Sequence, residues 1–479
     1  MKPYFSVLLL IIFTLSASCV RNPVTGKRDF MLLSKKQEIA MGAQSDPEIV
    51  SFFGLYDDEE LQRFIDVKGE QMAAISHRPE LDYDFKILDS PVVNAFAVPG
   101  GYVYFTRGIL AHFNNEAEFA GVLGHEIGHI AARHSAKQYS KAMLAQVGLV
   151  AGMVISPEFA QFADVANQGV SLLFLKFGRD AEEQSDKLGV ECSTKIGYDA
   201  EEMAEFFLTL NRMRTESDVE AVPTFLSTHP DPANRYEAVQ KLAAIWQEKL
   251  NVTDLEENRN QYLRMIDGMV YGEDPKQGFV EENVFYHPVL KFKFPIPSDF
   301  TFQNTPQQVQ MAHTSGKAIA MFTLAQGESL EAAAQAALQN YQLQPLESRQ
   351  LTVSGLPAVA VVAERQQEGQ QPLQVLLYLI SYEGNIYQFM GISSANEFNS
   401  FARYFTDIFN NFAPLTDPDK LNRQPERIRI KTVQRAGTLA EALRRHGVPE
   451  ERMEELALLN GMELTDPVEA GLLFKVIER

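Results

Sequence analysis

The pentapeptide His125-Glu126-Ile127-Gly128-His129 constrains this chain more than any other feature, because its two histidines stand four residues apart in an apolar-periodic stretch. Side chains four apart lie on one face of an α-helix, so both imidazoles can bind one metal ion. Glu126 leaves the helix at another angle and can reach a water bound to that metal. The pattern therefore predicts a zinc site with a general base.

The residues around the pentapeptide favour a helix. Asn115 can cap its amino end, Glu118 follows at capping-box spacing, and apolar residues recur at helical intervals. The alternative is that both histidines are ordinary core or surface residues, which the helical context makes the weaker explanation. His112 and His134 lack this arrangement, and we interpret them as ordinary polar residues.

A catalytic zinc ion takes three protein ligands and a water, so a further ligand is required. The best candidates lie on a second predicted helix that ends at Gly197. Glu182 could complete the coordination, and Asp186 could accept a hydrogen bond from the outer nitrogen of a ligating histidine. Spacing alone does not separate Glu182 from Asp180 or Glu183, since all three could form a solvated acidic face.

Four motifs occur in an order that resembles one peptidase family. They are the segment 94–101 (NAFAVPGG), the HEIGH helix, the segment RDAEEQSDKLG and the later Ser227-Thr228-His229-Pro230. The chain resembles the gluzincin family that includes BepA, HtpX and the CAAX prenyl endopeptidases, and most closely its bacterial exported, BepA-like branch. The resemblance covers about Asn22 to Gly272.

The resemblance implies one zinc ion per subunit, held by His125, His129 and Glu182, with Glu126 as the base in peptide-bond hydrolysis. Gln184-Ser185 stands where relatives commonly carry Glu-Ala, but neither position is a ligand. His229 would be a catalytic residue that donates to the reaction intermediate, or a fourth zinc ligand that latches the site closed. The simplest alternative is that His229 is only a structural residue, placed before the turn-forming Pro230.

The strand-like stretch 92–105 has a turn at Pro99-Gly100-Gly101. By the same resemblance it would supply the edge along which an extended substrate pairs. Asn94 is a candidate backbone clamp on that substrate edge strand.

The amino end is typical of an exported protein. Lys2, an apolar run and then small residues indicate a signal peptide over residues 1–18, too short to span a membrane. Ser16 to Cys19 resembles a bacterial lipoprotein signal with lipidation on Cys19, the alternative being ordinary cleavage near Ser18. Val20 after the cysteine then implies the outer membrane of a Gram-negative cell, facing the periplasm. Cys192 is the only other cysteine, so no disulfide framework is expected.

Length and composition predict an α+β multidomain chain. A net charge of −20 argues against nucleic acid as a partner, and 479 residues suffice for about three domains. We expect a mainly helical zincin catalytic domain (19–272), an α+β sandwich accessory domain (282–414), a polar linker (415–426) and a β-α-α-β unit (427–479). The accessory domain weakly resembles PsbP-type folds and shows no catalytic constellation.

The last unit resembles a degenerate LysM module, which implies binding to peptidoglycan. Arg435-Ala436-Gly437-Thr438 stands where that family opens with Pro-Gly-Asp-Thr, so a purely structural cap is the alternative. The apolar segment 142–155 is too short to span a bilayer and is expected to be buried within the domain. The alternatives are a mobile flap over the active site and a surface that meets unfolded or membrane-inserting substrates.

Two functions compete. The first is an exported zinc metalloendopeptidase that removes misfolded or unassembled envelope proteins. The second is a non-enzymatic envelope chaperone or cell-wall scaffold with a latched or structural zinc site. The intact Glu126 favours the enzyme, because a structural site needs no general base. Natural substrates, cleavage preference and oligomeric state leave no trace in the sequence.

Overall fold

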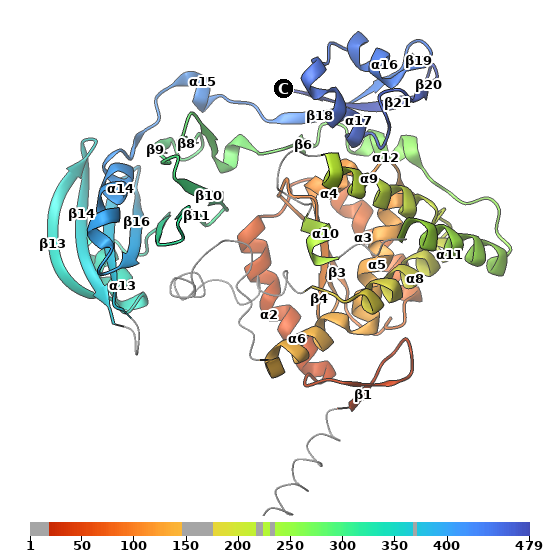
Figure 1. Ribbon diagram of the computed structural model, residues 1–479, viewed down its shortest axis with the longest axis horizontal. Coiled ribbons are helices and arrows are strands. Elements are labelled where there is room, and N and C mark those ends of the chain that lie inside the picture. Colours follow the sequence, from red (N-terminus) through yellow and green to blue (C-terminus); the bar gives the residue numbers. More distant parts are fainter. Residues whose placement is uncertain (1–18, 146–175, 217–223, 230–234, 367–370) are drawn as a thin grey trace, which may run out of the picture.

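The computed structural model describes residues 19–145, 176–216, 224–229, 235–366 and 371–479. The predicted signal peptide, and all of the apolar segment 142–155 beyond Ala145, lie outside these ranges. At this level the prediction of an α+β multidomain chain is confirmed: the amino-terminal region is helical and the later region is rich in strands (Figure 1). None of the helices within the described ranges is long and apolar enough to cross a membrane.

The helical region surrounds a small sheet. Its helices are α2 (Lys35–Phe53), α3 (Glu59–Ile75), α4 (Arg107–His112), α5 (Glu116–Ala132), α6 (His134–Ala145), α8 (Arg179–Lys195), α9 (Glu202–Glu216), α10 (Thr224–Thr228), α11 (Arg235–Leu250) and α12 (Arg259–Met265). Its sheet has the order β3 (Asp84–Leu88), β5 (Tyr102–Thr106), β4 (Ala95–Val98), which leaves β4 at an edge. A separate pair, β1 (Cys19–Arg21) and β2 (Arg28–Phe30), precedes the helices.

Helix α5 lies at the centre of this region, and every one of its residues is buried. Asn115 caps it as predicted, since its side chain accepts from the Glu118 N–H. The reciprocal capping-box bond is shifted by one residue, because the Glu118 carboxylate accepts from the Asn114 N–H. The helix ends at Arg133, whose left-handed backbone (φ 61°) turns the chain into α6.

The predicted second helix is confirmed as α8, and it packs directly on α5. Glycines make the close approach possible: a Cβ on Gly124 would lie 2.9 Å from the Cα and carbonyl oxygen of Gly189. Gly128 similarly faces Ser185 and Leu188. The two helices that carry the candidate ligands are thus held at backbone-to-backbone distance.

The accessory region contains two antiparallel sheets. The larger runs in the order β10 (Phe300–Asn304), β11 (Gln308–His313), β12 (Ala318–Leu324), β16 (Asn385–Ser394), β15 (Leu373–Tyr382), β14 (Leu356–Arg365), β13 (Gln344–Val353). The smaller runs β17 (Ala413–Pro414), β9 (Phe292–Pro295), β8 (Val284–His287), β7 (Phe279–Glu281). Helix α14 (Phe398–Asn410) and the smaller sheet cover one face of the larger sheet, and α13 (Leu330–Asn340) covers the other. This region thus combines strands and helices.

The last unit follows the predicted β-α-α-β order. It consists of β18 (Glu426–Thr432), β19 (Gly437–Thr438), α16 (Leu439–Arg445), α17 (Met453–Leu459), β20 (Pro467–Val468) and β21 (Leu473–Glu478). Strand β18 pairs with β21 and also with β6 (Val270–Tyr271) of the helical region. Ile428, Phe474 and Val476 belong to the same hydrophobic core as α5, so this unit packs onto the helical region (Figure 1).

Candidate metal centre

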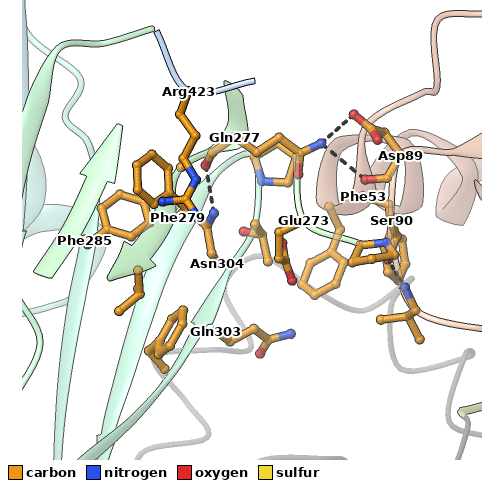
Figure 2. Close-up of a pocket in the computed structure, with 18 residues that line it drawn as sticks. Phe53, Asp89, Ser90, Glu273, Gln277, Phe279, Phe285, Gln303, Asn304 and Arg423 are labelled. Carbon is orange, nitrogen blue, oxygen red and sulfur yellow. Dashed lines mark hydrogen bonds between the residues drawn. The ribbon is translucent and has the colours of Figure 1, made fainter. Parts of the chain in front are cut away.

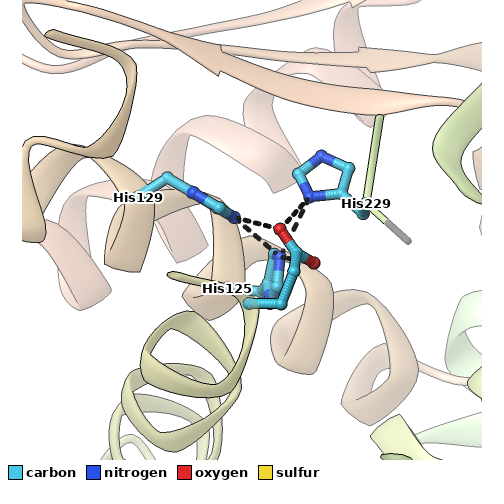
Figure 3. Close-up of side chains that lie close together, drawn as sticks. His125, His129 and His229 are labelled. Atoms are coloured by element: carbon cyan, nitrogen blue, oxygen red, sulfur yellow. Dashed lines mark hydrogen bonds and ion pairs between the residues drawn. The ribbon is translucent and has the colours of Figure 1, made fainter. Parts of the chain in front are cut away.

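Four buried side chains from three parts of the helical region converge on one point. His125 and His129 come from α5, Glu182 from the first turn of α8, and His229 directly follows α10. Their nearest ligand atoms all lie within 4.8 Å of one another, and none of the four residues is more than 1% exposed. Figure 3 shows the three imidazoles directed at the carboxylate between them.

The distances fit a single metal ion. His125 Nε2 and His129 Nε2 lie 2.9 Å apart, and His229 Nδ1 lies 3.3 Å from His125 Nε2 and 3.2 Å from Glu182 Oε1. Among the described side chains, Glu182 Oε2 and both oxygens of Glu126 have no hydrogen-bond partner. Buried carboxylate oxygens nearly always have a partner, so these atoms fit a centre that receives a cation and a water.

Glu126 lies beside the ligand group without belonging to it. Its Oε1 is 3.7 Å from His229 Nε2. Burial raises the pKa of the Glu126 carboxyl above its ordinary value, while the neighbouring His229 and His125 counteract part of that rise. A raised carboxyl pKa suits a group that takes and returns a proton near neutral pH.

The pKa values of Glu182 and His129 are both lowered, which leaves the carboxylate charged and the imidazole neutral. Burial alone would raise the pKa of Glu182, but the neighbouring imidazole of His229 lowers it below the ordinary value, so the carboxylate stays charged. Burial lowers the pKa of His129 well below its ordinary value, so its imidazole stays neutral. A charged carboxylate and a neutral imidazole are the forms that bind a metal ion.

Asp186 lies where the sequence predicted, behind His125. Its Oδ1 is 2.8 Å from His125 Nδ1, so that nitrogen donates and Nε2 is free to face the ligand group. Arg235 of α11 donates to both carboxylate oxygens of Asp186, at 2.7 and 2.8 Å. The sequence analysis did not single out Arg235, because a residue that acts through a partner on another helix leaves no spacing pattern.

His134 was interpreted as an ordinary polar residue, and this was wrong. Its Nδ1 lies 3.0 Å from His129 Nδ1, and its Nε2 lies 3.0 Å from Gln184 Oε1. With Nε2 donating to Gln184, the Nδ1 of His134 accepts from His129, and the His129 Nε2 lone pair turns toward the ligand group. Gln184, which is no ligand, thus takes part in orienting one.

The stretch 92–105 forms a hairpin as predicted, and its first strand, β4, is the open edge of the small sheet. Asn94 directly precedes β4, and its side-chain Oδ1 is buried without a hydrogen-bond partner among the described residues. The Val93 carbonyl at this edge accepts from the Phe225 N–H of α10 at 3.2 Å. The predicted clamp role of Asn94 stays a prediction.

The two cysteines lie outside the ligand group. Cys19 is the first residue of β1, and its lipidation stays a prediction. Cys192 is buried in α8, where burial raises the pKa of its thiol to about 12.

A His-Glu-x-x-His helix, a glutamate from a second helix and a buried carboxylate beside them define a metallopeptidase domain. Residues 59–243 of this domain match the family model described as Peptidase family M48.

Curated relatives agree with this assignment. The chain is similar to the mitochondrial metalloendopeptidase OMA1 of Arabidopsis thaliana, with 30% identity over 42% of this chain and 40% of the relative. It is also similar to the putative beta-barrel assembly-enhancing protease of Vibrio cholerae serotype O1, with 29% identity over 37% of this chain and 38% of the relative. The matched region thus spans well under half of each relative.

The similarity to solved structures is low. The cyanobacterial PsbP from Synechocystis sp. PCC 6803 aligns with 27% of this chain and 91% of its own, at 8% identity and a TM-score of 0.24. A likeness of that size assigns no fold, so the PsbP-type character of the accessory region stays a prediction.

Proposed function

We propose that this chain is a zinc metalloendopeptidase that hydrolyses unfolded or unassembled polypeptides in the cell envelope. The observation that carries the proposal is Glu126, a fully buried carboxylate with no hydrogen-bond partner among the described residues, beside three candidate ligands. A structural zinc site has four protein ligands and no use for such a base.

Different residues would bind the metal ion, orient its ligands and transfer the proton. His125, His129 and Glu182 would hold the metal ion, and Asp186 and His134 orient the two imidazoles. When bound, the ion supplies Lewis-acid polarisation of the substrate carbonyl and lowers the pKa of a water. Glu126 would take a proton from the attacking water and return it to the leaving amine.

His229 acts as a latch in this proposal. Its Nδ1 lies among the ligand atoms, 3.2 Å from Glu182 Oε1. A residue that donates to the reaction intermediate would instead lie farther from these atoms, because the substrate carbonyl would stand between them. A fourth protein ligand leaves no open position for water or substrate. The enzyme in this form is closed, and it becomes active when His229 leaves the centre.

The test compares the variants H229A, H229A/E126Q and H229A/E183Q on casein, with zinc content measured by mass spectrometry. Glu183 is a matched control because it is exposed and lies on α8 next to the ligand Glu182. We expect metal-dependent cleavage by H229A and by the control, and a loss of at least about a hundredfold with E126Q at full zinc content. If H229A with a full complement of zinc cleaves nothing, the non-enzymatic scaffold is correct.

The cellular location is part of the proposal and is tested separately. We propose an exported protein, anchored by lipid on Cys19 to the outer membrane and facing the periplasm. The variant C19A should move from the membrane fraction to the soluble periplasmic fraction, and unchanged fractionation would contradict the anchor.

Peptidoglycan is a proposed partner of the last unit only. A pull-down of the full chain with cell-wall sacculi, with and without soluble N-acetylglucosamine oligomers as competitor, tests it. Equal recovery in the presence and absence of the competitor would leave this unit as a structural cap.

A further inference from the structure

A cleft of about 520 Å³ lies between the peptidase domain and the accessory domain (Figure 2). One wall consists of Phe52 and Phe53 at the end of α2, together with the segment 90–92. The other wall consists of Phe279, Phe285 and the end of β10. Its volume is in the range of sites that bind ligands or peptide side chains.

Exposed apolar side chains stand on both walls. Phe302 of β10 is 43% exposed and Val92 is 40% exposed, although each lines the cleft. Phe52 and Phe53 pack edge to face at 4.8 Å and add a rigid aromatic surface. Facing apolar groups that remain in water are typical of an interaction site.

The cleft also contains an open sheet edge. β10 is the outermost strand of the seven-stranded sheet, and no described strand pairs with its other side. Thr305 and Gln308 exchange both main-chain bonds, so by antiparallel alternation the N–H and C=O of Phe302 point away from β11. Such an edge can bind an extended peptide by adding a strand.

Hydrogen bonds through Gln277, which lies between the two domains in the sequence, fix the cleft. Gln277 donates to Asp89 Oδ2 at 2.6 Å, and Asn304 donates to the Gln277 carbonyl at 2.7 Å. Figure 2 shows these bonds across the top of the cleft. The walls therefore stand at a defined separation, and binding an extended chain need not first order them.

The cleft lies next to the start of the edge strand β4. Val92 is three residues from Ala95, the first residue of the edge strand β4, which is at most about 11 Å along an extended chain. A substrate that pairs antiparallel to β4 runs toward Asn94, so its carboxyl-terminal part leaves the centre on the side of Val92. The hydrogen bond from the Phe225 N–H to the Val93 carbonyl crosses this path. Phe225 is four residues before His229.

We infer that the cleft is an exosite that binds, in extended form, the apolar segment of a substrate polypeptide on the carboxyl side of the scissile bond. Pairing with the open edge of β10 supplies main-chain recognition, and Phe302 and Val92 receive alternate side chains. This inference rests on the proposed peptidase function and gives it a substrate class: long, unfolded, strand-prone polypeptides.

Binding without cleavage provides the first test. The probe is a fluorescein-labelled peptide of about 12 residues that alternates apolar and polar side chains, roughly 40 Å when extended. It is titrated by fluorescence anisotropy into full-length E126Q carrying F302S, V92S or L346S. Leu346 is the matched control, because it is 59% exposed on β13 at the opposite edge of the same sheet.

We expect F302S and V92S to weaken binding by about tenfold each, and L346S to leave it within about twofold of the parent. Because F302S and V92S lie on different domains, a shared loss does not arise from misfolding of one of them. Equal affinity in all four proteins would overturn the exosite. Binding that depends on Phe302 and Val92, without any cleavage by H229A, would refute only the peptidase function.

The direction in which the substrate lies in the cleft is tested with cleavable substrates in the H229A background. A fluorogenic peptide is extended by the same segment at its carboxyl or its amino end. The carboxyl-terminal extension should lower KM by about tenfold with little change in kcat, and F302S should abolish that gain. An equal gain from the amino-terminal extension would contradict the assigned direction.

Discussion

Asp186 shows how a single carboxylate outside the ligand group determines what a ligand can do. Burial opposes its ionisation, but Arg235 and His125 hold its pKa at about 2, so it is an anion at neutral pH. It therefore keeps the His125 proton on Nδ1. The Nε2 lone pair is left for the metal ion.

The variant D186N is expected to bind zinc about 10- to 100-fold more weakly, because the amide no longer holds His125 in this tautomer. Competition with a chromogenic chelator measures the affinity, and circular dichroism verifies the fold. E183Q, whose side chain is 61% exposed, should bind zinc like the parent. Parent-like affinity in a folded D186N would contradict the orienting role.

His112 makes the stability of the peptidase domain dependent on pH. It donates from Nδ1 to the Gly108 carbonyl at 2.7 Å, and burial lowers its pKa from 6.5 to about 4. Because the folded state resists protonation, its contribution is complete above pH 6.5 and is lost as the pH falls toward 4.

Between pH 7 and pH 5, His112 should account for about 2 kcal/mol of lost unfolding free energy. Urea denaturation of the parent and of H112N at both pH values measures it. The variant should lose less stability on acidification than the parent. An identical loss in both proteins would show that His112 does not carry the effect.

Local spacing was enough to predict His125, Glu126 and His129, and a four-residue interval brought Asp186 into consideration. His134 could not be found in this way. It reaches the outer nitrogen of His129 only because Arg133 adopts a left-handed conformation and turns the chain back. The sequence contains no rule that requires that conformation in an arginine.

At the scale of elements, the glycines on α5 set the distance between the two ligand-bearing helices. Gly121, Gly124 and Gly128 recur on one face of α5, and a Cβ on any of them would meet α8 or α9. Helical periodicity predicted α5 and α8 as elements. It did not predict their contact, because small residues permit close approach without specifying the partner.

G124A is expected to destabilise the domain by about 1–3 kcal/mol, since the added methyl meets main-chain atoms of Gly189 at 2.9 Å. This steric cost exceeds the roughly 1 kcal/mol that alanine gains over glycine in a helix. Zinc affinity should fall as well, because α8 carries Glu182.

Thermal unfolding and chelator competition measure the two effects of G124A. The matched control is G178A, at the amino end of α8, where nothing lies within 4 Å of the added methyl. It should leave zinc affinity unchanged. A stabilised G124A would show that α5 and α8 can separate without cost.

At the scale of the whole molecule, the last unit is not a detached module. Lys475 is fully buried and donates to the carbonyls of Ala111 and Phe113 at 2.9 Å each, across to the end of α4. Its apolar residues continue the peptidase core, whereas the accessory domain has cores of its own. The alternation of residues in β18 and β21 predicted their strands. It could not show that the peptidase domain covers their apolar faces.

Scanning calorimetry should therefore resolve two transitions, one for the peptidase domain with the last unit and one for the accessory domain. K475M leaves two buried carbonyls without a donor and should lower only the first transition, by roughly 5–10 °C. K431M, which removes a partly exposed ion pair with Glu478, should shift it by much less. A shift confined to a third transition would show that the last unit unfolds independently.

The shared core also determines when, during synthesis, the metal centre gains its full support. The ribosome makes the chain from its amino end, and a domain folds once its residues are available. Phe474 and Val476, which belong to the core around α5, are synthesised long after all four candidate ligands. The metal centre therefore lacks part of its supporting core until β21 has been made, and so does a product truncated before β21.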